Sequence, residues 1–284
     1  MKRTSERLAL YGRVSRACSR SVTKAYSTSF SWAIRALSPG LRPDIYAIYG
    51  FVRLADEIVD SFDGYDRGAL LSELKAETDR AIEDRISINP ILHAFQETYH
   101  RYGIEREHVD LFLRSMEWDL DRTKYDRESF ESYIVGSAEV VGLMCLKVFV
   151  QGNQEEFDRL EPTAIRLGAA FQKVNFLRDL KEDYQDLGRS YFPSIDLSRL
   201  DEAAKAQIEA EIEEDLVAAR SGIAALPREA RFGVYLAYTY YRQLLRRIRR
   251  VPSRAVMESR IRVPDSLKVL LIATAYARHR LNLI

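Results

Sequence analysis

Residues 44–60 read DIYAIYGFVRLADEIVD, and this stretch indicates the fold class. Its apolar side chains recur at helical spacing and cover nearly the whole circumference, which predicts a helix buried in the protein. At 100° per residue, four polar side chains of this helix project within about 40° of one another. They are Tyr49, Arg53, Asp56 and Asp60. The sequence thus predicts a line of one phenol, one guanidinium group and two carboxylates on an otherwise apolar helix.

The rest of the chain shows the same helical character. Its 284 residues include only 13 Gly and 8 Pro, and 46% are hydrophobic. So few breakers favour long helices and argue against a turn-rich β-sandwich, a collagen-like chain or a disordered one. Gly and Pro divide the sequence into helix-sized segments, and no linker-like stretch separates two halves. We therefore expect a single all-α domain over residues 1–284.

Charge and cysteine content narrow the function classes. Lys and Arg number 43 against 42 Asp and Glu, so the chain lacks the basic excess of a nucleic-acid binder. The two cysteines, Cys18 and Cys145, lie too far apart for a metal knuckle, which favours a reducing, cytoplasmic setting. The four histidines have no metal-ligand spacing. We expect neither a membrane-spanning segment nor a signal peptide.

Carboxylates at positions i and i+4 repel each other unless a cation lies between them. A hard divalent ion such as Mg²⁺ suits Asp56 and Asp60, because it prefers carboxylate oxygen and leaves positions open for phosphates. Spacing alone is weak evidence, since Glu73 and Glu77 share it. The apolar surroundings distinguish the first pair, because they suggest that its acids end in a cavity.

A second helix, FQKVNFLRDLKEDYQD at 171–186, repeats this arrangement. Its polar arc of about 100°, with Arg178 at the edge, comprises Gln172, Asn175, Asp179, Glu182, Asp183 and Asp186. Acids on two opposing helices can hold several Mg²⁺ ions, and these ions together with Arg53 and Arg178 can clamp a pyrophosphate. The chemistry indicated is the departure of diphosphate from an allylic carbon.

These motifs resemble the squalene/phytoene synthase family, the head-to-head prenyl transferases, from about Tyr26 to the C-terminus. The first segment is YSTSFSWAIRALSP (26–39) followed by YAIYGFVRLADEIVD (46–60). The second is MEWDLDRTKYDRESFESYIVGSAEVVGLM (116–144), and the third is NFLRDLKEDYQDLGRSYFP (175–193). A fourth, weaker segment is LAYTYYRQLLRRI (236–248) with the tail RIRVPDSLKVLLIATA (260–275). The resemblance implies an isoprenoid-synthase-type helical bundle around a central cavity.

The resemblance also implies roles for individual residues. The implied metal ligands are Asp56, Asp60, Asn175, Asp179 and Asp183. The acids act in catalysis together with Arg53 and Arg178. Residues implied to bind the substrate diphosphate are Ser27, Ser29, Tyr49, Arg53, Gln172, Asn175, Arg178, Arg189, Tyr191 and Tyr241. The expected ion is Mg²⁺, with Mn²⁺ as the alternative, and we expect no NADPH.

The chain departs from the family pattern in two places. Where the family commonly reads YCYxVAGxVG, this chain reads YIVGSAEVVG, so Val135 replaces an aromatic residue and Glu139 a glycine. Val135 is expected to widen the pocket, and Glu139 has no assigned role. The loop from Asp183 to Arg189 is one residue longer than usual.

The second segment and the tail are most similar to phytoene synthases, so we expect condensation of two geranylgeranyl diphosphates to phytoene. The alternative is a squalene or dehydrosqualene synthase that acts on farnesyl diphosphate. A non-catalytic scaffold of the same fold is disfavoured, because all four aspartates and both arginines are present. The oligomeric state is left open.

Two further expectations concern the aromatic residues near the acidic motifs and contact with a membrane. Of the aromatic residues near the acidic motifs, we expect most to be core and a few to line a hydrocarbon tunnel; they are Phe30, Trp32, Tyr46, Phe51, Phe171 and Phe176. Because substrate and product are lipids, we also expect transient contact with the inner membrane face. The basic run predicted to make this contact includes Arg246, Arg247, Arg249 and Arg250.

Overall fold

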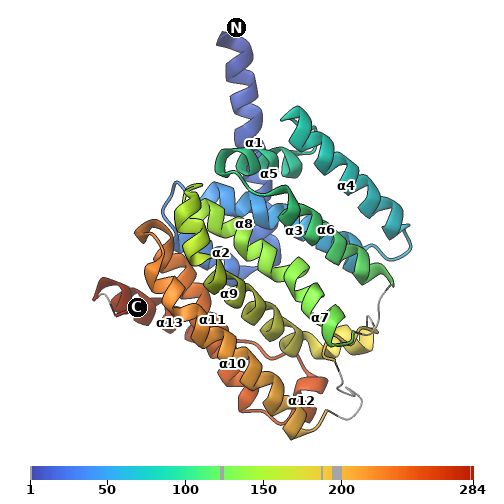
Figure 1. The fold of residues 1–284 in the computed structure, drawn as a ribbon, viewed down its shortest axis with the longest axis vertical. Coiled ribbons are helices and arrows are strands. Elements are labelled where there is room, and N and C mark those ends of the chain that lie inside the picture. Colours follow the sequence, from blue (N-terminus) through green and yellow to red (C-terminus); the bar gives the residue numbers. More distant parts are fainter. Residues whose placement is uncertain (1, 122–124, 187, 194–199, 282) are drawn as a thin grey trace.

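The computed structural model describes residues 2–121, 125–186, 188–193, 200–281 and 283–284. This part of the chain is built of helices and contains no β-strand, as Figure 1 shows, so the all-α prediction is confirmed. The α-helices are α1 (Lys2–Tyr26), α2 (Thr28–Ala36), α3 (Arg42–Ser61), α4 (Arg67–Asp84), α5 (Pro90–Tyr102), α6 (Arg106–Asp121), α7 (Arg127–Ile134), α8 (Val140–Phe149), α9 (Gln154–Lys181), α10 (Glu202–Ala225), α11 (Arg228–Arg249), α12 (Ser253–Glu258) and α13 (Asp265–Arg280). Two π-helical turns interrupt them, η1 (Val135–Glu139) and η2 (Glu182–Asp186).

Several Asn, Gly and Pro residues lie at helix ends. Asn89 and Asn153 each cap a helix N-terminus with their side chains, at α5 and α9. Gly103 ends α5 in the left-handed conformation, with φ of 64°, which glycine adopts without steric cost. Pro227 and Pro264 immediately precede α11 and α13.

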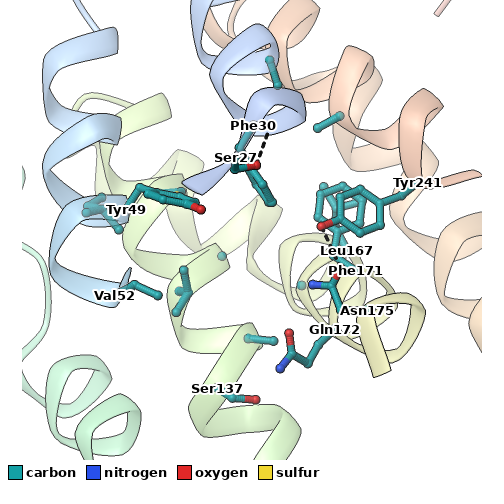
Figure 2. A pocket seen from close by; sticks show the side chains of 18 of the residues that line it. Ser27, Phe30, Tyr49, Val52, Ser137, Leu167, Phe171, Gln172, Asn175 and Tyr241 are labelled. Carbon is teal, nitrogen blue, oxygen red and sulfur yellow. Dashed lines mark hydrogen bonds between the residues drawn. The ribbon is translucent and has the colours of Figure 1, made fainter. Parts of the chain in front are cut away.

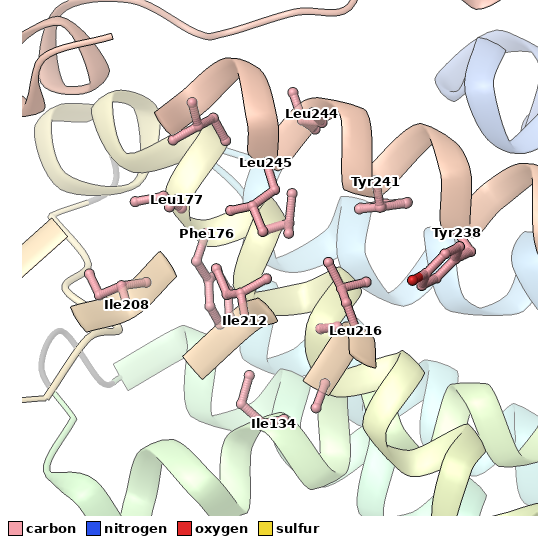
Figure 3. Close-up of a cluster of buried hydrophobic side chains, with 14 of the residues drawn as sticks. Ile134, Phe176, Leu177, Ile208, Ile212, Leu216, Tyr238, Tyr241, Leu244 and Leu245 are labelled. Carbon is pink, nitrogen blue, oxygen red and sulfur yellow. The ribbon is translucent and has the colours of Figure 1, made fainter. Parts of the chain in front are cut away.

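Two hydrophobic clusters hold the helices together. In the first, α3 packs against α1, α5, α6 and α8, and Phe51, Phe95 and Phe112 are fully buried. In the second, α9 packs against α10 and α11, and Figure 3 shows Leu177, Ile212 and other aliphatic side chains meeting between these helices. The two acidic helices therefore belong to different halves of the core.

One helical run, Arg127–Phe149, is long and apolar enough among the described residues to cross a bilayer by length and composition. It comprises α7, η1 and α8, and 56% of its most apolar part is buried inside the fold. Burial of this kind is the setting of a core helix. Gly168 on α9 lets it come close, because a Cβ there would lie 2.8 Å from the carbonyl oxygen of Ala138.

Candidate functional site

A cavity of about 780 Å³ runs between the two halves of the core. Along α9, Leu160 lines it at one end and Asp179 at the other, about 28 Å apart at 1.5 Å per residue. The same order recurs on α3, where Ile45 precedes Asp60. The cavity thus has an apolar end and a polar end.

All the site residues predicted from the sequence line this one cavity. They are Ser27, Ser29, Tyr49, Arg53, Asp56, Asp60, Gln172, Asn175, Arg178, Asp179, Asp183, Arg189, Tyr191 and Tyr241. Figure 2 shows Ser27 and Tyr49 on one wall, and Gln172, Asn175 and Tyr241 across from them. The structure therefore brings together residues up to about two hundred positions apart, whereas their roles stay predictions. The side chain of Asp186 lies outside the described part.

On the first acidic helix, the guanidinium group of Arg53 donates hydrogen bonds to Asp56 and Glu57, one turn further along α3. It also lies 4.2 Å from the ring centroid of Tyr26, a cation–π contact. Ser27, at the start of α2, accepts a hydrogen bond from the backbone N–H of Phe30 at 3.2 Å and so caps that helix at the cavity wall.

On the second acidic helix, Arg178 pairs with Asp179 through two hydrogen bonds, of 2.8 and 2.5 Å. Asn175 accepts a hydrogen bond from the Tyr241 hydroxyl at 3.2 Å. The α-helix ends at Lys181, and the π-helical turn η2 then carries Asp183. The regular spacing assumed from the sequence therefore holds up to Asp179 and changes before Asp183. Such turns are frequent at functional sites.

Negative charge exceeds positive charge at the polar end. Among the described cavity residues, six are acids and four are arginines. Burial, with repulsion from Asp60, raises the pKa of Asp56 to about 7. Burial, with repulsion from Asp179 and Asp60, raises the pKa of Asp183 to about 8. Acids of the two helices thus face each other closely enough to disfavour the ionised form.

This donor set fits a divalent cation chemically, because close oxygen ligands with unfavourable mutual repulsion gain most from one. In the described residues, however, no three such side chains are already grouped around a common point. The carboxylates instead accept hydrogen bonds from arginines. Arg53 donates to Asp56, and Arg189 donates to Asp60 at 2.6 Å. Binding of a cation would require these carboxylates to exchange an arginine for the metal.

Two charged residues of the cavity were missed in the sequence analysis. Arg260, between α12 and α13, binds Asp179 at 2.8 Å and Glu182 at 3.1 Å. Asp119 on α6 is buried and hydrogen-bonds Tyr133 and Tyr191. Both lie in quoted segments, in the tail and in MEWDLDRTKYD, but their spacing has no helical relation to either acidic pair.

Half of the six aromatic residues near the acidic motifs line the cavity, more than the few that were expected. Phe30, Phe171 and Phe176 line the cavity. Tyr46 and Phe51 are buried in the core beside α3. Trp32 is half-buried and is not among the cavity residues.

Neither of the two residues that depart from the family motif, Val135 and Glu139, is among the described cavity residues. Widening of the pocket by Val135 is therefore not seen, because this side chain packs against the first hydrophobic cluster.

Several known proteins are similar to this chain in sequence. A model of the squalene/phytoene synthase family matches residues 23–266. A phytoene synthase of Arthrospira platensis is 28% identical over 295 residues, which cover 92% of each chain. A presqualene diphosphate synthase of Rhodopseudomonas palustris is 32% identical over 173 residues, which cover 60% of each chain.

Solved structures share the fold. A dehydrosqualene synthase in complex with a ligand superposes with a TM-score of 0.81 at 22% identity, over 95% of this chain and 98% of the other. A squalene synthase from Alicyclobacillus acidocaldarius superposes with a TM-score of 0.74 at 24% identity, over 85% and 95%. At such identities the likeness establishes the helical fold alone.

Proposed function

Because the chain belongs to the squalene/phytoene synthase family and is a prenyltransferase of that type, we propose that it condenses two geranylgeranyl diphosphates head to head into phytoene. We further propose that residues 1–284 act as one catalytic domain. The observation that carries the proposal is a single cavity with acids and arginines at one end and an apolar lining at the other. This is the polarity of a prenyl diphosphate.

The proposed orientation follows from that polarity. The hydrocarbon chains lie toward Leu160 and Ile45, where no charged group lines the described wall, and the diphosphates lie toward Asp56 and Asp179. Arg53 and Arg178 bind diphosphate oxygen, since guanidinium groups bind phosphate through paired hydrogen bonds. Tyr49, Tyr241 and Ser27 surround the same space.

The reaction runs in two steps. One diphosphate leaves, and the resulting allylic cation alkylates the double bond of the second substrate. Loss of a proton then gives a cyclopropyl diphosphate. Departure of the second diphosphate is followed by rearrangement and loss of another proton, which gives the linear hydrocarbon. Phe171 and Phe176 line the cavity, where aromatic rings can stabilise a carbocation without reacting with it.

Divalent cations are part of this proposal. Mg²⁺, or alternatively Mn²⁺, supplies charge compensation for the leaving diphosphate. The residues that would hold it are Asp56, Asp60, Asn175, Asp179 and Asp183. Arg189 and Tyr191 cover the same end of the cavity. We propose no role for NADPH, because loss of a proton completes the reaction to phytoene.

The experiment is an incubation of the purified protein with Mg²⁺ and either geranylgeranyl or farnesyl diphosphate, with and without NADPH. Extracted hydrocarbons are identified by mass spectrometry. We expect phytoene from geranylgeranyl diphosphate in the absence of nicotinamide. Squalene as the sole product, formed only when NADPH is supplied, would contradict the proposal.

A second candidate is condensation of farnesyl diphosphate that stops at presqualene diphosphate or continues to a squalene-type product. The 32% identity with the presqualene diphosphate synthase of Rhodopseudomonas palustris favours it. A cyclopropyl alcohol, recovered after phosphatase treatment of a farnesyl diphosphate reaction, would identify the stopped reaction.

We also propose a cytoplasmic enzyme that touches the membrane transiently, because its substrates and product partition into lipid. Nucleic acid has no part in this proposal.

A further inference from the structure

Asp119 lies at the polar end of the cavity but belongs to neither acidic helix. It is 6% exposed, and both carboxylate oxygens accept hydrogen bonds. The Tyr133 hydroxyl donates to Oδ2 at 2.6 Å, and the Tyr191 hydroxyl donates to Oδ1 at 3.1 Å. Tyr191 is fixed further by stacking on Phe176, with ring centroids 4.0 Å apart. The carboxylate of Asp119 is thus held in place at both of its oxygens.

The same residue lies beside the guanidinium group of Arg189. That group donates to the Asp119 carbonyl oxygen at 2.8 Å, to the Val59 carbonyl oxygen at 3.2 Å and to the Asp60 carboxylate at 2.6 Å. Arg189 is only 5% exposed. Three described carboxylates therefore lie near this buried positive charge, those of Asp60, Asp119 and Asp183. Of these, Asp60 binds the guanidinium group through its side chain, and Asp119 alone is not a proposed metal ligand.

This arrangement bears on how Asp60 becomes available to a cation. If Asp60 were the sole counter-charge, its departure would leave Arg189 buried and unpaired, which is strongly unfavourable. With Asp119 fixed nearby, the charge of Arg189 stays compensated when Asp60 turns away. The main-chain oxygens of Val59 and Asp119 meanwhile hold the guanidinium group in place.

We infer that Asp119 is a positioning residue, the permanent counter-charge of Arg189 that frees Asp60 to bind a divalent cation. The inference rests on the proposed function, because it assumes that Asp60 is a metal ligand. We do not assign Asp119 as a ligand itself, because a cation there would compete with the hydrogen bonds that it accepts from Tyr133 and Tyr191.

The test compares Asp119→Asn with the unaltered protein by calorimetric titration of Mg²⁺ in the presence of inorganic diphosphate. Asp44→Asn is the matched control, because Asp44 is an equally buried aspartate bound by Tyr102 and Arg101, away from the cavity. We expect Asp119→Asn to weaken Mg²⁺ binding at least tenfold without changing the number of ions bound. Asp44→Asn should lower the melting temperature and leave Mg²⁺ binding unchanged.

Asp119→Glu keeps the charge and should bind Mg²⁺ within about threefold of the unaltered protein; it also serves if Asp119→Asn does not fold. Mg²⁺ binding by Asp119→Asn that equals that of the unaltered protein would overturn the inference, as would a tenfold loss in Asp119→Glu. Loss of one bound ion in Asp119→Asn would make Asp119 a ligand and also overturn it. The outcomes above would overturn the inference and leave the proposed function standing. Absence of Mg²⁺ binding by the unaltered protein would instead contradict the proposed function itself.

Discussion

Arg189 donates a hydrogen bond to Asp60 across 129 positions of sequence, at 2.6 Å. The contact joins the segment that follows the second acidic helix to the end of the first. Arg53 and Arg178 similarly hold Asp56 and Asp179. The arginines that we propose to bind diphosphate are therefore the present partners of the acids that we propose to bind metal. Metal and diphosphate together would satisfy both sets, so each should strengthen the binding of the other.

Removal of one acid should abolish this joint binding. We expect Asp56→Ala and Asp179→Ala each to lower turnover by several orders of magnitude, because the diphosphate charge is then left uncompensated. Circular dichroism should stay strongly helical, since these acids are close to other acids. Glu73→Ala, on α4 and exposed, is the control with unchanged turnover. Normal turnover in both cavity variants would refute the proposed site.

The stability of the metal-free protein should fall as the pH rises. The pKa values of Asp56 and Asp183, about 7 and about 8, lie above the value of 3.8 expected in the unfolded chain. Between these limits the folded state binds more protons than the unfolded state, so the free energy of unfolding decreases with pH. Thermal melts between about pH 5.5 and 8.5 should show this decrease, and added Mg²⁺ should reduce it. If the melting temperature of the double variant Asp56→Asn, Asp183→Asn fell with pH as steeply as that of the unaltered protein, other groups would be the cause.

Much of the fold and site could be predicted because both rest on local periodicity. Asp56 and Asp60 lie on one helix, and their apolar neighbours on α3 indicated that they end in a cavity. The partner of Asp60 and the second partner of Asp179 could not be predicted, because Arg189 and Arg260 arrive from distant segments by tertiary packing. The place of Asp119 in the site could not be predicted for the same reason, since its tyrosine partners are 14 and 72 positions away.

Glu139, which replaces a glycine of the family motif, lies outside the cavity and close to a group of charged residues. Lys173 lies close enough to attract it, and Lys173 in turn binds the buried Asp215 at 2.7 Å. Arg166 binds the other oxygen of Asp215, also at 2.7 Å. Burial nevertheless raises the pKa of Glu139 to about 7, so partial loss of solvent outweighs the attraction of the two cations.

Replacement of Glu139 should therefore stabilise the protein more at high pH than at low pH. We expect Glu139→Gln to raise the melting temperature by a few degrees near pH 8.5 and by less near pH 5.5, which lies between the unfolded pKa of 4.5 and the folded pKa of about 7. Turnover should not change, since Glu139 is not among the described cavity residues. Glu128→Gln, at the exposed start of α7, is the control for the substitution itself. The same gain at both pH values would rule out ionisation as its cause.

The basic run at the end of α11 is less uniform than its sequence implies. Arg246 and Arg250 are exposed. Arg249 is exposed too, but it binds Glu213 at 2.8 Å and lies 3.7 Å from Glu209, both on α10. Its charge is therefore largely compensated within the protein, and the surface offered to an anionic membrane consists mainly of the other arginines.

Liposome co-sedimentation should reveal this difference. Each basic residue near an anionic leaflet contributes about 1 kcal/mol, and salt attenuates it, so we expect binding that requires anionic lipid and weakens as salt is added. The double variant Arg246→Gln, Arg250→Gln should bind more weakly than the unaltered protein, whereas Arg249→Gln should differ little. Binding that ignored both salt and these substitutions would exclude the basic run as the membrane contact. In that case the exposed apolar side chains of α13, Leu270 and Tyr276, become the surface to alter, because apolar contact with lipid does not weaken with salt.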